Sequence, residues 1–335
     1  GIFFLNGSVA MPTKDNVLKY LKESDGFVSG EELSVKLNVS RTAVWKSIES
    51  LRSAGYKIDS VTNRGYKLGF SPDRYSEEEI KFGLETDFIA KDIYCFDSID
   101  STNNEAKRSA LRGAPNGSLF VAEQQTGGKG RLGRSFSSPG GVSLYFSILL
   151  RPEDAAVNVG SLTLIAGLAV CEAIRGYTGL NAVIKWPNDV VIGSRKVCGI
   201  LTEMSAEVER IEFLVVGIGV NVNNTEFAKE LEAKATSLYL ESGEKFRRIG
   251  LLKEILKKFE VFLKSTAAGN MEFLGEYKKY CVSLGRRVSF TREGKQFTGT
   301  AVNISPKGEL IVKLDGGGLV TVFSGEVCVQ GIYGQ

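Results

Sequence analysis

The chain has 335 residues, 43% of them hydrophobic, enough for two or three domains with buried cores, and its formal charge of +3 excludes a polyanion partner recognised by overall charge. It contains no histidine, which excludes Ser-His and Cys-His nucleophiles and leaves positioning, electrostatics and carboxylates for catalysis. Its five cysteines lack CxxC spacing and no apolar run is long enough to span a membrane, which predicts a cytoplasmic protein with reduced cysteines and no membrane partner.

Residues 13–70 have the pattern of a winged helix-turn-helix. We interpret residues 1–12, which begin GIFFLNGSVA, as a vector-derived remnant and N-terminal tail outside the fold. Ser29 and Glu32 have capping-box spacing at the start of a second helix, and Thr62–Gly65 supplies the turn of a hairpin. The predicted helices cover Asp15–Glu23, a short segment from Ser29, and Arg41–Ala54, and the predicted wing strands cover Tyr56–Val61 and Gly65–Leu68.

This arrangement predicts DNA binding, with the third helix entering a major groove by its N-terminal residues. The alternative is a small three-helix packing or dimerisation module. We favour DNA binding because the recognition-helix layout and the wing occur together. The candidate contacts are Ser40, Arg41, Thr42, Trp45, Lys46 and Arg64.

Around Gly69–Pro72 the pattern lapses, and we place a domain boundary there. A helix over 76–84 and a strand over 93–96 follow, and then Ser101, Thr102 and Asn103 precede a helix over 104–112. Such residues at a strand-to-helix turn cap the helix by default. They could also hydrogen-bond a polar ligand at the helix start.

The stretch Val121–Arg134, VAEQQTGGKGRLGR, combines four glycines with three cations. Its glycine amides can approach a ligand closely while Lys129, Arg131 and Arg134 bring positive charge, a combination that favours an anion. Predicted strands over 119–123 and 142–150 hold both ends of the stretch. The alternative is a flexible basic surface loop.

Further cations come from two downstream segments. Lys185 and Asp189 stand at the two ends of a turn, Lys-Trp-Pro-Asn-Asp, which could be a surface ion pair. Lys196 lies at the start of a predicted strand over 195–201, and Asn221 ends another over 211–222. The remaining predicted elements are a core helix over 160–177, strands over 183–185 and 190–192, an amphipathic helix over 243–265, and a small all-β barrel from about 284, with strands over 287–291, 296–304, 310–314 and 319–323.

In these motifs the chain resembles the bifunctional biotin protein ligase and biotin-operon repressor family from about residue 13 onward. The winged helix, Ser-Thr-Asn at 101–103, GKGRLGR at 128–134, Lys-Trp-Pro-Asn-Asp at 185–189, Arg-Lys-x-x-Gly-Ile-Leu at 195–201 and the barrel occur in family order. Lys129 and Leu132 depart from the arginine and the basic residue usual in that loop.

The resemblance implies an α+β multidomain fold. Its parts would be a winged helix-turn-helix (13–70), a central domain with a class II synthetase-like mixed sheet and helices (71–280), and a small SH3-like β-barrel (281–335). It also implies a biotin ligase that condenses biotin with ATP to biotinoyl-5'-AMP and then biotinylates a lysine of the biotin carboxyl carrier protein of acetyl-CoA carboxylase. The adenylate would act as corepressor and promote a homodimer that binds operator DNA.

The family also implies roles for residues of the central domain. Biotin would contact Ser101, Thr102, Asn103, Gln125, Lys129, Gly130, Arg131 and Lys196. ATP or the adenylate would contact Gly128, Arg131, Arg134, Phe136, Lys185, Asn188, Asp189 and Asn221, with Phe136 stacked on adenine. Lys196, Lys185 and Arg131 would be catalytic, and Asp189 would contact Mg²⁺.

Two other functions remain open from the sequence. A metabolite-sensing repressor could bind its ligand without turnover, although the number of phosphate-directed cations argues against that. A ligase for lipoate or another small acid could share the central domain, although the winged domain makes it less favoured.

Overall fold

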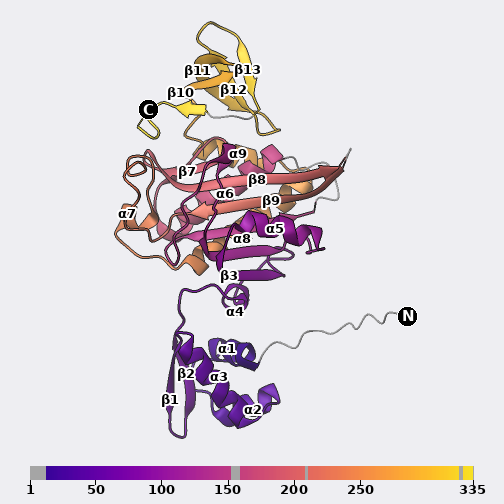
Figure 1. Cartoon of the computed structure of the whole chain (residues 1–335), viewed down its shortest axis with the longest axis vertical. Coiled ribbons are helices and arrows are strands. Elements are labelled where there is room, and N and C mark those ends of the chain that lie inside the picture. The colour runs from indigo at the N-terminus through magenta and orange to yellow at the C-terminus, as the bar shows by residue number, and fades with distance from the viewer. Residues whose placement is uncertain (1–12, 152–158, 208–209, 324–326, 335) are drawn as a thin grey trace, which may run out of the picture. The chain divides into compact units, whose positions relative to one another are not determined.

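The computed structural model describes residues 13–151, 159–207, 210–323 and 327–334 (Figure 1). The chain forms two compact units, and the boundary between them lies between Phe82 and Gly83. The tail expected over residues 1–12 lies outside the described residues. The predicted fold class is confirmed, with an N-terminal helix-turn-helix, a central mixed sheet with helices and a C-terminal β domain.

The first unit is a winged helix-turn-helix. Ser29 accepts a hydrogen bond from the amide of Glu32 at 3.0 Å, and Ser40 accepts one from the amide of Ala43 at 3.1 Å, so the second and third helices begin at side-chain caps. Asn38 between them adopts a left-handed φ of 51°. The elements are α1 (Thr13–Glu23), α2 (Gly30–Leu37), α3 (Arg41–Ser53), β1 (Lys57–Val61), β2 (Gly65–Phe70) and α4 (Glu77–Lys81).

Helix α4 belongs to this first unit. The buried carboxylate of Glu79 pairs with Lys22 of α1 at 2.6 Å and accepts a hydrogen bond from the Tyr56 hydroxyl at 2.9 Å. These contacts extend the unit twelve residues beyond the boundary expected at position 70. A local lapse of pattern could not reveal them because their partners are distant in sequence.

Asp15 of α1 gives the winged unit a pH-dependent stability. Burial and the neighbouring charge of Glu78 raise the pKa of Asp15 from 3.8 to about 6. A raised pKa in the folded state adds stability below the unfolded value, which is lost as pH rises through about 6. We therefore expect Asp15→Asn to unfold at higher urea concentration than the parent at pH 7.5, with the difference shrinking toward pH 4. Asp25→Asn, at an exposed position, is the control, and a difference that is constant with pH would contradict the assignment.

The second unit is built on a seven-stranded sheet in the order β3-β4-β5-β9-β8-β7-β6. Strands β3 and β4 run parallel and all other neighbours are antiparallel. The strands are β3 (Ile93–Ile99), β4 (Leu119–Gln125), β5 (Leu144–Leu150), β6 (Ala182–Lys185), β7 (Asp189–Ile192), β8 (Arg195–Glu207) and β9 (Arg210–Val220).

Helix α6 (Val159–Thr178) is the core helix expected from its all-round apolar pattern. Contrary to the expectation that no apolar run would be long enough to span a membrane, α6 is long and apolar enough by length and composition, but 67% of its apolar window is buried within the protein. It packs on strands β6 and β8 and on two later helices. The other helices are α5 (Thr102–Leu111), α7 (Leu238–Ser242), α8 (Arg248–Ala267) and α9 (Glu272–Tyr280).

The helix expected over 243–265 begins later than predicted. Gly243 ends α7 with a left-handed φ of 78°, and α8 starts only at Arg248. Apolar periodicity located the buried stripe of α8 but not the break before it.

The C-terminal part folds as a five-stranded antiparallel sheet in the order β13-β12-β11-β10-β14, drawn in yellow tones in Figure 1. Its strands are β10 (Arg287–Arg292), β11 (Lys295–Ile304), β12 (Leu310–Leu314), β13 (Leu319–Val322) and β14 (Val327–Val329). The buried Trp186 joins this domain to the central sheet, because its indole N–H donates to the carbonyl of Gly308 at 2.9 Å. The three-residue β14 was too short to be predicted.

Candidate active site and DNA-binding surface

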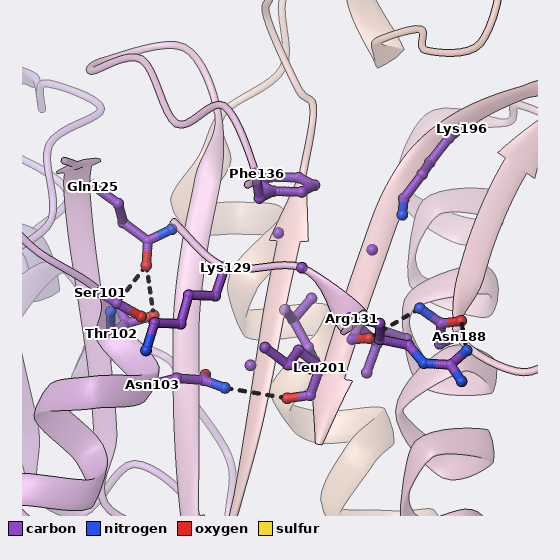
Figure 2. Close-up of a pocket in the computed structure, with 16 residues that line it drawn as sticks. Ser101, Thr102, Asn103, Gln125, Lys129, Arg131, Phe136, Asn188, Lys196 and Leu201 are labelled. Atoms are coloured by element: carbon purple, nitrogen blue, oxygen red, sulfur yellow. Dashed lines mark hydrogen bonds between the residues drawn. The ribbon is translucent and has the colours of Figure 1, made fainter. Parts of the chain in front are cut away.

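A hollow opens between the N-terminus of α5, the glycine-rich loop and strands β8 and β9 (Figure 2). Its lining combines polar side chains at the start of α5, cationic side chains from the loop, and residues of strands β8 and β9. The lining residues are Ser101, Thr102, Asn103, Gln125, Lys129, Gly130, Arg131, Phe136, Asn188, Lys196, Gly199, Ile200, Leu201, Gly217, Ile218 and Gly219.

The Ser-Thr-Asn turn both caps α5 and lines the hollow. The Ser101 hydroxyl accepts from the amide of Asn104 at 3.5 Å, so the helix begins two residues earlier than expected. The backbone amide and the hydroxyl of Thr102 donate to the Gln125 side-chain oxygen at 2.9 and 3.1 Å. The capping role is therefore confirmed, and ligand binding by the same residues stays a prediction.

Ser147 of β5 is hydrogen-bonded to two residues of this turn. It is fully buried in an otherwise apolar strand, and its hydroxyl lies 2.6 Å from the Asn103 amide oxygen and 2.8 Å from the Thr102 hydroxyl. Asn103 also donates to the carboxylate of Glu203 at 2.8 Å. A single hydroxyl within the apolar segment LYFSILL is the signal in the sequence that could have identified Ser147.

The glycine-rich loop is tied to the rest of the site by specific hydrogen bonds. The Lys129 ammonium donates to the Asn104 side chain at 3.0 Å, and Arg131 donates to the Asn188 side-chain oxygen at 2.8 Å. The amide of Gly130 donates to the carbonyl of Arg134 at 2.7 Å. These bonds connect the loop to α5 and to the turn before β7.

Lys196 enters the hollow from β8. Its ammonium lies 2.6 Å from the carboxylate of Asp189, which also accepts a hydrogen bond from the Asn188 amide at 3.2 Å. Figure 2 shows the Lys196 side chain directed into the space bounded by Phe136, Arg131 and Asn188. Asn188 thus connects the arginine of the loop to the Asp189–Lys196 pair.

Asp189 remains charged in this setting. Burial disfavours its ionised form, but the charge and hydrogen bond of Lys196 and a hydrogen bond from Tyr333 outweigh burial, so the pKa of the carboxyl lies below its usual value. Each carboxylate oxygen has a close protein donor, Lys196 on one and Tyr333 at 2.6 Å on the other. A metal ion at Asp189 would have to bind beside the Lys196 ammonium, which lies 2.6 Å from the same carboxylate, so the carboxylate does not fit the Mg²⁺ role expected of it. Among the described residues, no group of three or more His, Cys, Asp or Glu side chains is placed to hold a metal.

Lys185 is not among the described residues that line the hollow, and the nucleotide contact expected of it stays a prediction. Its side chain is buried, and its ammonium donates to the carbonyl of Val327 at 3.0 Å and lies 4.8 Å from the centre of the Tyr333 ring. Lys185 and Asp189 are both buried, which also excludes the alternative of a surface ion pair at this turn. The C-terminal domain covers this end of the β6–β7 hairpin.

Four other expected residues, including Asp189, are not among the described residues that line the hollow. Arg134 is exposed, and Gly128 packs closely within the loop, where an added Cβ would be 2.4 Å from the carbonyl oxygen of Phe136. Asn221 is buried and donates to the carbonyl of Thr236 at 3.0 Å.

Three glycines of the sheet were missed as site residues. A Cβ on Gly217 would lie 2.0 Å from the Asn103 oxygen, and one on Gly219 would lie 2.7 Å from the Phe136 ring. On Gly199 it would lie 2.9 Å from the Lys196 side chain. For Gly217 and Gly219 the signal was the alternation in VVGIGV, because residues two apart in a strand share one face.

Cys198, close to Lys196, is not an activated thiol. Burial raises the pKa of this thiol, and the charge of Lys196 only partly opposes the effect. The thiol therefore stays protonated and unreactive.

In the winged unit, the six candidate DNA contacts are all exposed. Arg41 pairs with Glu31 of α2 at 2.5 Å, and the Arg64 guanidinium lies 4.6 Å from the centre of the Phe27 ring. Trp45 is 54% exposed, which is unusual for a large aromatic side chain in a folded unit. Arg41, Thr42 and Trp45 line a broad cleft with the wing residues Ser60–Asn63.

Three family models match separate parts of the chain. They are the Biotin/lipoate A/B protein ligase family over residues 95–221, an HTH domain over 13–67 and the Biotin protein ligase C terminal domain over 283–329.

Whole proteins are similar over nearly the same length. The Bifunctional ligase/repressor BirA of Bacillus spizizenii is 37% identical over 317 residues, which cover 94% of this chain and 97% of that protein. The protein of the same name from Bacillus subtilis is 36% identical with the same coverage. The solved Biotin protein ligase from Aquifex aeolicus in complex with biotin and ATP is 35% identical, with a TM-score of 0.63 over 72% of this chain and 99% of that chain.

Proposed function

This chain belongs to the bifunctional biotin ligase/repressor family, and from that premise we propose which residues carry its two activities. The protein is a biotin–protein ligase and a DNA-binding repressor, and biotin and ATP are its substrates. The observation that carries the assignment is the convergence of Lys129, Arg131 and Lys196 on one hollow beside the N-terminus of α5.

In the proposed first step, a carboxylate oxygen of biotin attacks the α-phosphorus of ATP and the bond to pyrophosphate breaks. The carboxylate is ionised at neutral pH, so the step needs no general base, only alignment and charge neutralisation. We assign alignment of biotin to the polar floor of Thr102, Asn103 and Gln125. We assign charge neutralisation to Arg131 and Lys196, with Phe136 stacked on the adenine.

We assign Mg²⁺ to the phosphates of ATP instead of Asp189. Mg²⁺ in nucleotide sites is commonly held by substrate phosphates and water with few protein ligands. Asp189 then serves the reaction by orienting Lys196.

In the proposed second step, a lysine amine of the biotin carboxyl carrier protein attacks the acyl carbon, and the bond to AMP breaks. A second hollow beside the first shares Arg131 and Asn188 and adds the exposed side chains of Leu132 and Phe323. We propose that the acceptor lysine approaches through this second hollow.

We further propose that the adenylate-bound protein dimerises to bind operator DNA. Strand β8 pairs with β7 only over Arg195–Gly199 among the described strands, and Met204 on its remaining edge is 57% exposed. An open strand edge can pair with a second copy. Two copies would present two α3 helices to a palindromic site, so a ligand that tightens the dimer also tightens DNA binding.

Three measurements on one sample test the enzyme assignment. Biotin, ATP and an acceptor peptide should yield pyrophosphate, AMP and a biotinylated lysine. Biotin binding without pyrophosphate release would favour the non-catalytic sensor. Faster single-turnover adenylation of lipoate than of biotin would favour a lipoate ligase.

Arg41→Ala is expected to weaken DNA binding while leaving ligation unchanged. One lost contact to a phosphate or base costs about 1–3 kcal/mol, so affinity should fall roughly 5- to 150-fold. Salt-dependent binding to operator DNA measures the loss, and a loss confined to one sequence would identify a base contact. Lys36→Ala, exposed on α2 outside the cleft, is the matched control. Equal affinities of parent and Arg41→Ala would remove Arg41 from the DNA surface.

A further inference from the structure

Tyr333, among the last described residues, contacts the Asp189–Lys196 pair and is not among the described residues that line the hollow. Its hydroxyl donates to the Asp189 carboxylate at 2.6 Å, and the other oxygen of that carboxylate holds Lys196. The two contacts connect the C-terminal domain to the ammonium that enters the hollow. Sequence analysis assigned no role to Tyr333.

The position of Tyr333 is fixed by three further observations. Its amide donates to the carbonyl of Ser194 at 2.9 Å, in the turn between β7 and β8. Its ring lies against the Lys185 ammonium. Its backbone has a φ of 61°, a conformation that a non-glycine residue adopts only when its surroundings hold it. The residue therefore clamps the β7–β8 hairpin that carries both Asp189 and Lys196.

The chemistry of the contact also favours one protonation state. Burial, followed by the negative charge of Asp189, raises the pKa of the Tyr333 hydroxyl, so it stays a donor. The hydrogen bond in turn favours the ionised form of Asp189. An ionised, oriented carboxylate is what holds Lys196 in one place.

We propose that Tyr333 is a positioning residue for adenylate formation, acting through Asp189 to place the ammonium of Lys196 in the hollow. This inference rests on the proposed role of Lys196. It extends the reacting machinery beyond the central domain, because the tip of the C-terminal domain then contributes to the chemical step as well as to folding.

The test is Tyr333→Phe in the full-length protein. We expect kcat for biotin-dependent pyrophosphate release to fall roughly 10-fold, in line with loss of one hydrogen bond to a charged group, while KM for biotin changes by less than about 3-fold. The acid limb of the kcat–pH profile should move to higher pH, because Asp189 loses a donor that favours its ionised form. A structural defect alone would lower the active fraction without moving the profile.

Tyr277→Phe is the matched control. The Tyr277 hydroxyl is buried and has no hydrogen-bond partner among the described residues, so its removal should leave kcat and the pH profile at parental values.

A double-mutant cycle with Asp189→Asn separates an action through Asp189 from an independent effect. Tyr333→Phe should add less than about 2-fold to the defect of Asp189→Asn, because the two residues act as one unit. Additive losses, or parental kcat and pH profile in Tyr333→Phe, would overturn the inference. If the parent protein releases no pyrophosphate with biotin and ATP, the proposed ligase function is wrong. That result differs from a failure of the Tyr333 inference, in which the parent is active and Tyr333→Phe behaves like it.

Discussion

Replacement of Lys196 by alanine is expected to lower the rate of biotinoyl-5'-AMP formation by roughly 10²- to 10³-fold. Losses of that size follow removal of one charged or dipolar group that stabilises a transition state in an enclosed site. Lys196 is suited to this role because its ammonium faces the hollow and is held by Asp189 at 2.6 Å. Single-turnover pyrophosphate release measures the effect directly, without the transfer step.

Alanine at position 196 also leaves the Asp189 carboxylate without its cation, so the fold has to be checked separately. An unpaired buried charge is costly, whereas a neutral amide in its place is much less so. Lys196→Ala combined with Asp189→Asn should therefore recover stability but not adenylation. Lys258→Ala is a matched control, since Lys258 has a similar exposure, 32% against 29%, and also pairs with a carboxylate, at 3.0 Å from Glu172. A parental adenylation rate in Lys196→Ala would refute the assignment of this lysine.

Local patterns in the sequence were sufficient to predict the winged unit. The serine caps of α2 and α3, the turn before β2 and the apolar spacing of α1 each involve neighbours within a few residues. The same applies to the core helix α6, whereas the roles expected of the residues that line the hollow came from the family resemblance. Such signals are local consequences of backbone geometry, so one sequence reveals them.

The direction of Lys185 was not predictable in the same way. Periodicity placed it at the end of a strand, but its burial depends on the C-terminal domain, whose contacting residue Val327 is 142 positions away. The attachment of α4 through Glu79 depends on Lys22 and Tyr56 and was missed for the same reason.

A register irregularity between β7 and β8 made the direction of the Lys196 side chain unpredictable from the sequence. The pairing of β7 with β8 shifts between Val190 and Val191, so Val191 pairs with Lys196 and Val190 with Cys198. A bulge of this kind redirects side chains, and strict alternation cannot say which face they occupy. Family precedent, not periodicity, identified Lys196 in the sequence.

Gly217→Ala is expected to abolish measurable biotin binding, with affinity at least 100-fold below the parent. The added Cβ would lie 2.0 Å from the Asn103 oxygen, far inside any van der Waals contact. Asn103 cannot easily move away because it is bonded to Ser147 at 2.6 Å and to Glu203 at 2.8 Å. The polar floor of the hollow must therefore shift, and buried polar groups left without partners weaken binding severely.

Gly219→Ala provides the complementary result on the same strand. Its Cβ would meet the Phe136 ring at 2.7 Å, so ATP affinity should fall while biotin affinity stays within about 3-fold of the parent. Isothermal titration with each substrate separates the two effects. Gly176→Ala is the control, because a Cβ there meets no heavy atom within 4 Å. Equal loss of both substrates in both strand variants would indicate general disruption of β9, and parental biotin binding in Gly217→Ala would show that biotin does not depend on the Asn103 floor.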